Sequence, residues 1–113
     1  MSDCIFCKIR DKEIPSKQVY EDEKVLAFED INPKDQVHLL IVPKKHIPTV
    51  AEVSQDDEIL LGHLVIVAKK LAKENNLTGY KLQFNVGKTA GQIVFHVHLH
   101  LMGHRFNPSP ETN

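Results

Sequence analysis

The sequence has no apolar run that approaches the roughly 20 residues needed to span a bilayer. Its first residues contain neither a basic region nor an apolar segment of the kind found in secretion signals, so we expect a cytoplasmic protein with no membrane partner. An excess of charge of one sign is also missing, because 14 basic and 15 acidic residues leave a net charge of -1 at pH 7. This balance gives no reason to expect electrostatic binding of nucleic acid.

Cysteine is scarce: the chain has two, Cys4 and Cys7, in the pattern Cys-x-x-Cys. Without a secretion signal, two cysteines do not predict a disulfide-stabilised fold. A redox-active pair with this spacing normally follows a strand and begins a helix, and no strand can precede position 4. The pair is therefore interpreted as half of a metal site, provided that two further ligands lie elsewhere in the chain.

The remaining composition is that of an ordinary globular protein, with 42% apolar and 26% charged residues. At 113 residues the chain suffices for one core, so we expect one domain over 1–113 with an irregular tail over about 106–113. Helical spacing and strand alternation predict an α+β fold with about five antiparallel strands. The expected helices lie within 4–13 and 54–75, and the expected strands are 19–21, 25–28, 38–42, 81–86 and 95–101.

Two of the expected strands carry more detailed predictions. Residues 38–42 are continuously apolar after His38, as expected of a central strand covered on both faces, and Pro43 ends the strand. The strand over 81–86 alternates, and we expect it to turn three apolar side chains inward: Leu82, Phe84 and Val86. Residues 87–92 should then form a hairpin connection into the last strand.

The expected long helix begins with a pattern that resembles a capping box, in the sequence Ser-Gln-Asp-Asp over 54–57. Apolar residues cover more of its surface than one face, which is more than a single sheet can bury. The surplus predicts a second covered side, most simply a homodimer with this helix at the interface.

Three histidines alternate with apolar residues near the C-terminal end. Because side chains at i, i+2 and i+4 of a strand share a face, His96, His98 and His100 are expected to line one side. The other side should pack on the core through Phe95, Val97, Leu99 and Leu101. Imidazole can act as a nucleophile, move protons near neutral pH or bind a metal. The three rings would span about 13 Å at roughly 3.3 Å per residue, too far for one ion to bind all three.

Gly91-Gln92, followed closely by His-Val-His-Leu-His-Leu, is similar to the signature of the histidine-triad (HIT) family of nucleotide hydrolases and transferases. Residues 28–31, 38–46 and 61–64 also match the short Hint-like branch of that family in order and spacing. The resemblance implies the HIT-like fold and hydrolysis of purine nucleoside phosphoramidates or related adenylated compounds. The implied chemistry proceeds through a nucleotidyl-histidine intermediate and needs no catalytic cofactor.

The resemblance also implies roles for individual residues. His98 matches the nucleophile that attacks the α-phosphorus, and His100 and His38 match the groups that contact the phosphate and help the leaving group depart. Asp30 matches the carboxylate that binds ribose, although the residues alone are equally compatible with a solvated carboxylate at a strand end. The other implied contacts to a purine nucleotide come from Asn85, Gly91, Gln92 and Ile93 near the phosphate, and from a base slot of Ile5, Phe6, Ile9, Phe28 and Ile31.

A structural Zn²⁺ ion is implied as well, held by Cys4, Cys7, His46 and His96. Strand alternation alone places His96 beside His98, so a local twist has to turn it toward the N-terminus. At Ile93 some relatives carry Ser, so only the backbone amide of this residue is expected to reach the leaving group. Two other functions stay open: hydrolysis of dinucleoside polyphosphates, and a non-catalytic, zinc-stabilised nucleotide-binding scaffold.

Overall fold

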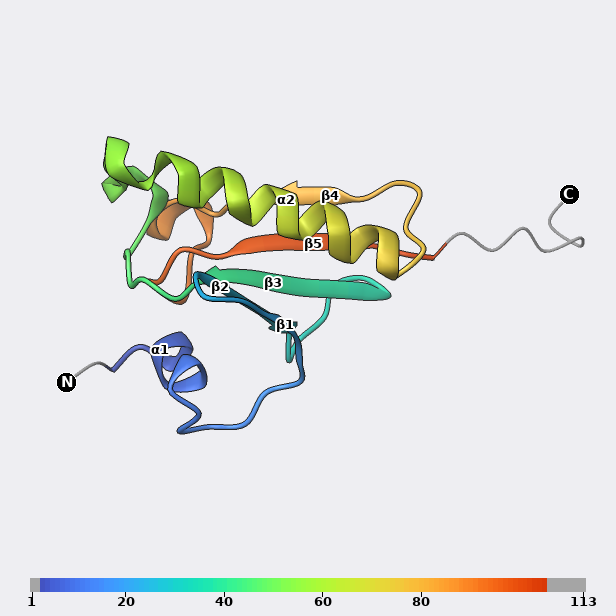
Figure 1. Cartoon of the computed structure of the whole chain (residues 1–113), viewed down its shortest axis with the longest axis horizontal. Coiled ribbons are helices and arrows are strands. Elements are labelled where there is room, and N and C mark those ends of the chain that lie inside the picture. Colours follow the sequence, from blue (N-terminus) through green and yellow to red (C-terminus); the bar gives the residue numbers. More distant parts are fainter. Residues whose placement is uncertain (1–2, 106–113) are drawn as a thin grey trace, which may run out of the picture.

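The computed structural model describes residues 3–105, which form a five-stranded antiparallel sheet with a helix against each face (Figure 1). The strands are β1 Gln18–Glu21, β2 Val25–Glu29, β3 Val37–Pro43, β4 Lys81–Gln83 and β5 Leu99–Gly103, in the spatial order β1-β2-β3-β5-β4. The long helix α2, Glu58–Glu74, covers one face, and the short helix α1, Ile5–Arg10, covers the other. The predicted α+β class, with its antiparallel sheet and its short and long helices, is confirmed.

Strand β3 is the centre of the sheet and separates two apolar clusters. Every residue of the strand is buried, as the continuous apolar pattern predicts. Leu39 and Ile41 pack in the larger cluster beneath α2, whereas Leu40 and Val42 pack in the smaller cluster that contains Phe6 of α1. His38 has the same parity as Leu40, so it faces the α1 side of the sheet.

Helix α2 begins as its sequence predicts. Ser54 and Asp57 form a capping box. The Ser54 side chain accepts a hydrogen bond from the backbone of the first turn, and the Asp57 side chain accepts one from Ser54 N–H. A 3-10 turn, Gln55–Asp57, leads directly into α2, and the helix ends one residue before Asn75. The side chain of Asp57 is also paired with Lys45 Nζ at 2.6 Å, which ties the helix start to the loop after β3.

Strand β4 differs from its prediction in length and in burial. It ends at Gln83 rather than at residue 86, and all three of its residues are exposed, with Leu82 at 38%. Val86 is exposed as well, and only Phe84 packs partly against the larger cluster. The inward assignment was wrong for Leu82 and Val86, and β4 is the edge strand of the sheet, paired with β5.

The connection from β4 to β5 is longer than a tight hairpin. The two strands pair antiparallel, but residues 84–98 lie between them. Within this connection, Lys88–Ala90 form a 3-10 turn between Gly87 and Gly91, which have φ values of 90° and 89°. Such φ values are strained for residues with a Cβ atom, so both glycines are needed for this path.

One expectation lies outside the described residues, and a second is tested only within them. The irregular tail predicted for 106–113 falls beyond the described residues. Within residues 3–105, no helix combines the length and the apolar character that crossing a membrane requires.

Candidate active site and metal centre

The histidine segment is extended over only part of its predicted length. Strand β5 begins at Leu99, and Val97, although outside the strand, is buried in the core as expected. Phe95 is 44% exposed, so its predicted place in the core was wrong. Alternation fails at Phe95 because the chain bends over residues 94–96. Directly after the bend, Val97 N–H donates a hydrogen bond to Ile47 O at 2.7 Å.

This bend separates His96 from the other two histidines of the triad. The ring of His96 is fully buried, and its Nε2–H donates to Pro43 O at 2.7 Å. Its Nδ1 therefore carries a lone pair, and this atom lies 3.3 Å from Cys4 Sγ and 3.6 Å from Cys7 Sγ. The zinc hypothesis required a local turn that directs His96 toward the N-terminus, and the structure has this turn.

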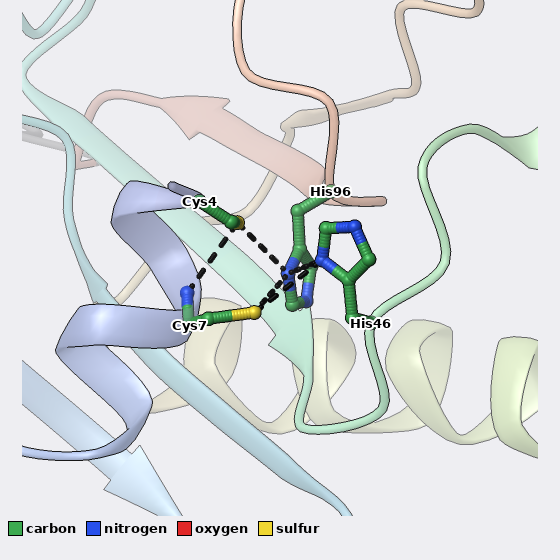
Figure 2. A group of neighbouring side chains, drawn as sticks. All are labelled: Cys4, Cys7, His46 and His96. Carbon is green, nitrogen blue, oxygen red and sulfur yellow. Dashed lines mark hydrogen bonds between the residues drawn. The ribbon is translucent and has the colours of Figure 1, made fainter. Parts of the chain in front are cut away.

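Four side chains converge on this point from three parts of the chain, as Figure 2 shows. Cys4 caps the N-terminus of α1 and accepts a hydrogen bond from Cys7 N–H, so both sulfur atoms lie at one end of the helix. His46 comes from the loop after β3, and its Nδ1 is 3.3 Å from Cys7 Sγ and 3.1 Å from His96 Nδ1.

The four potential ligand atoms fit a tetrahedral metal ion. Metal–sulfur bonds of about 2.3 Å and metal–nitrogen bonds of about 2.0 Å imply distances between ligand atoms of roughly 3.3–3.8 Å. Four distances between ligand atoms of Cys4, Cys7, His46 and His96 run from 3.1 to 3.6 Å. Cys7 and His96 are buried whereas His46 is exposed. This group can hold a metal ion. The hydrogen bond from His96 Nε2–H to Pro43 O orients the imidazole, as outer-shell contacts to metal ligands do.

His98 lies on the other side of the bend, with its ring in a defined orientation. Its Nδ1–H donates to His96 O at 2.7 Å, which leaves the lone pair on Nε2. The ring is 9% exposed and meets the edge of Phe6 at a centroid distance of 5.0 Å. Burial lowers the pKa of His98 below its usual value, so the ring is neutral near pH 7. A neutral imidazole with an oriented lone pair is a competent nucleophile.

A second pair of rings stands beside His98. His100 is 4.9 Å away between ring centroids, and its Nδ1 is 2.9 Å from His38 Nε2. Burial is the main cause that lowers the pKa of His38 and brings the pKa of His100 to about 4. Asp30 Oδ2 lies 3.3 Å from His38 Nε2, so this carboxylate is in contact with the histidine cluster.

The loop that precedes the histidines is held by side-chain amides. Gln92 is buried, its Oε1 accepts a hydrogen bond from Gly87 N–H, and its Nε2 donates to Pro48 O and Val94 O. Asn85 Nδ2 donates to Ala90 O at 2.8 Å. These bonds orient the loop itself, so any contact of Gln92 with a ligand would have to come from its backbone.

The residues predicted to form a base slot fall into two groups. Phe6, Ile9 and Phe28 are buried in the smaller cluster, where the Phe6 and Phe28 rings meet edge to face at 5.4 Å. Ile5 and Ile31 are exposed, at 46% and 90%. The buried residues can form the floor of a base slot, and the exposed residues can form its rim.

Sequence reasoning missed two backbone contributions to the site. Pro43 O holds His96, and Lys34 N–H donates to His38 Nδ1 at 3.0 Å. Every residue has a backbone carbonyl and every residue except proline has an N–H, so no residue type in the sequence marks these two contributions. Phe95 was also misplaced: it lines a cavity of about 420 Å³ beside the metal group, together with Ile5 and Ile93.

Comparison with known proteins finds clear relatives of this chain. A family model described as "Scavenger mRNA decapping enzyme C-term binding" matches residues 3–113. The protein HitA of Neisseria gonorrhoeae is 46% identical over 104 residues, which are 91% of this chain and 97% of HitA. A HIT family hydrolase from Legionella pneumophila Philadelphia 1 has a similar structure, with a TM-score of 0.89 and 51% identity over 96% of this chain and 98% of the other.

A histidine triad nucleotide-binding protein from Candida albicans is similar as well, with a TM-score of 0.79 and 39% identity. That match covers 92% of this chain and 76% of the other. The chain belongs to the histidine-triad family. Of these similar proteins, one is named a hydrolase and another a nucleotide-binding protein.

Proposed function

We propose that this protein hydrolyses purine nucleoside phosphoramidates or related adenylated compounds through a covalent intermediate on His98. The observation that carries the proposal is the hydrogen bond from His98 Nδ1–H to His96 O at 2.7 Å, which holds the Nε2 lone pair available for attack. His100 and His38 lie next to it as groups that can move a proton.

The proposed reaction has two steps. His98 Nε2 attacks the α-phosphorus, a nitrogen–phosphorus bond forms to the enzyme, and the bond from phosphorus to the amine breaks as a proton passes from solvent through His100 to the amine. Water then attacks the nucleotidyl-histidine, its proton returns to solvent by the same route, and the nucleoside monophosphate leaves with His98 restored. Catalysis of this kind depends on positioning and electrostatic stabilisation.

The remaining residues of the site are proposed to bind the nucleotide. The base would lie against Phe6, Ile9 and Phe28 between the exposed Ile5 and Ile31. Asp30 is half-buried beside His38, which favours a carboxylate that accepts hydrogen bonds from the ribose hydroxyls over one that is merely solvated. Donors to the phosphoryl oxygens and the leaving group would come from Asn85 and from the backbone at Gly91, Gln92 and Ile93.

Zinc is the proposed occupant of the group formed by Cys4, Cys7, His46 and His96. Two thiolates and two imidazoles in tetrahedral proximity are the ligand set that zinc prefers in structural sites. The ion would fasten α1 to the loop after β3 and to the bend before β5. No step of the proposed reaction uses it.

The competing activity, cleavage of dinucleoside polyphosphates, makes a different demand on the site. A chain of several phosphates needs compensating cations or donors. Ile93, where such a chain would leave, is 89% exposed and offers no side-chain hydrogen bond. We expect kcat/KM for adenosine 5′-phosphoramidate to exceed that for diadenosine polyphosphates by at least about tenfold, or ~1.4 kcal/mol of transition-state preference. Steady-state assays of both substrates on one preparation measure the ratio, and a reversed ratio would assign the protein to the other activity.

The outer surface of α2 supports the proposed homodimer. Ile66 and Ile59 are exposed, at 60% and 87%, on the side of the helix that faces away from the sheet. Light scattering should give about twice the chain mass of 12.9 kDa. Ile66→Glu should dissociate the dimer because burying an unpaired charge costs several kcal/mol, whereas Ile66→Val should preserve it. A wild-type protein that stays monomeric at low micromolar concentration would exclude this interface.

A further inference from the structure

We propose that the backbone N–H of Lys34 is a positioning group, which fixes the tautomer of His38 and, through His38, makes His100 a donor at Nε2. The role in catalysis rests on the proposed function, whereas the assignment of the ring tautomers does not. The argument depends on one fact of hydrogen-bond chemistry: a backbone amide only donates, and a backbone carbonyl only accepts.

The first step concerns His38. Lys34 N–H donates to His38 Nδ1 at 3.0 Å, so this ring nitrogen carries a lone pair. The ring is 4% exposed, and its burial favours the neutral form, which has a single N–H. The hydrogen of His38 is therefore on Nε2. That atom lies 2.9 Å from His100 Nδ1 and 3.3 Å from Asp30 Oδ2.

The second step carries the assignment to His100. Its Nδ1 accepts the hydrogen bond from His38 Nε2–H, so the single hydrogen of neutral His100 is on Nε2. His98 has the opposite tautomer, because its Nδ1–H donates to His96 O. Two backbone groups thus give neighbouring rings the two forms that the reaction needs: a lone pair on His98 for attack, and an N–H on His100 for the departing amine.

A metal ion is the rival interpretation of this cluster. Asp30, His38 and His100 present ligand atoms within 4.8 Å of one another, close enough for one ion. Coordination through His38 Nε2 would move the ring hydrogen to Nδ1, where it would face the hydrogen of Lys34 N–H. The Lys34 bond therefore favours a chain of hydrogen bonds over a metal site, with the Asp30 carboxylate placed to stabilise positive charge on His38.

The turn between β2 and β3 explains why the Lys34 amide is in place. Asp30 Oδ1 accepts a hydrogen bond from Asn32 N–H at 2.8 Å, and Asp30 N–H donates to His38 O at 3.0 Å. The first bond is a local contact within the turn, and the second closes the turn across its base. The N–H of Lys34 is consequently directed at the ring of His38, near the start of β3.

The test replaces this one N–H. Protein in which Lys34 is exchanged for its α-hydroxy acid analogue has an ester oxygen in place of the amide and keeps the lysine side chain. Histidine ¹⁵N NMR shifts report which ring nitrogen bears hydrogen. In the wild type we expect hydrogen on Nε2 of His38 and His100 and on Nδ1 of His98. In the ester protein, His38 and His100 should populate both tautomers, and kcat for the phosphoramidate should fall at least about tenfold with KM little changed.

Two controls isolate the N–H. The same ester at Lys24, whose amide donates to Asp22 Oδ1 in the β1–β2 turn, should leave kcat within about twofold of wild type. Lys34→Ala keeps the amide and should keep the His38 and His100 tautomers, so it separates the effect of the backbone N–H from that of the side chain.

Wild-type protein with hydrogen on His38 Nδ1 overturns the inference without any variant. An ester protein with unchanged tautomers or unchanged kcat overturns it as well. If the tautomers shift as expected while the wild type does not hydrolyse the phosphoramidate, the proposed function fails and the tautomer assignment stands.

Discussion

Replacing His98 with alanine should lower kcat for adenosine 5′-phosphoramidate by at least about a thousandfold, because the variant has no atom that can form the covalent intermediate. The ring lies between Phe6 and His100, at centroid distances of 5.0 and 4.9 Å, so alanine also leaves a void in the site. His98→Asn is the better-matched variant, since its side-chain N–H can still donate to His96 O. Both variants should bind AMP with an affinity near that of the wild type, as measured by calorimetry.

The comparison with other histidines makes this result specific. Substitution of His100 should cost less than substitution of His98, because proton transfer is shared with His38. His104→Ala serves as the control, since His104 is exposed and its ring is 3.2 Å from the carboxylate of Asp35, away from the three site histidines. Near-normal turnover by His98→Asn would exclude the covalent mechanism. Absence of turnover in the wild type, with AMP still bound, would favour the non-catalytic scaffold.

Removal of the metal group should have the largest effect on stability. Protein purified without chelator is expected to hold about one Zn²⁺ per chain, measured by elemental analysis. Cys4→Ser should abolish stoichiometric zinc and lower the thermal midpoint by at least about 10 °C, since a loss of a few kcal/mol has roughly this effect in a domain of this size. The expected cause is that α1 loses its attachment to His46 and His96.

Catalysis should respond less than stability to the same change. At a temperature where both proteins are folded, kcat of Cys4→Ser should stay within about tenfold of wild type, because the proposed reaction makes no use of the ion. The control is again His104→Ala, which lies outside the metal group and should retain zinc and its thermal midpoint. Metal-free wild-type protein with an unchanged midpoint would contradict the structural role.

The sequence predicted those parts of the fold in which one local pattern decides the outcome. The apolar run of β3 requires cover on both faces, and the Ser54 capping pattern marks the start of α2 wherever the helix packs. The inward assignment of Leu82 and Val86 failed because alternation shows which residues share a face, but not whether that face is covered.

The site, too, has parts that the sequence predicted and parts that it could not predict. Proximity of Cys4, Cys7, His46 and His96 followed from the family resemblance, and the structure brings the four together. The bend before β5 could not be predicted, since the chain next to it makes a hydrogen bond to the distant Ile47 O. The bond from Lys34 to His38 was likewise invisible, because it involves a backbone group that every residue except proline has.

His96 belongs to both centres at once. Its ring faces the two cysteines, and its carbonyl oxygen accepts the hydrogen bond that orients His98. A substitution that moved this residue to improve one centre would displace the other. In evolutionary terms, the metal ligands and the nucleophile cannot drift independently, and a lineage that abandons the cysteine pair must find another way to hold this one peptide unit.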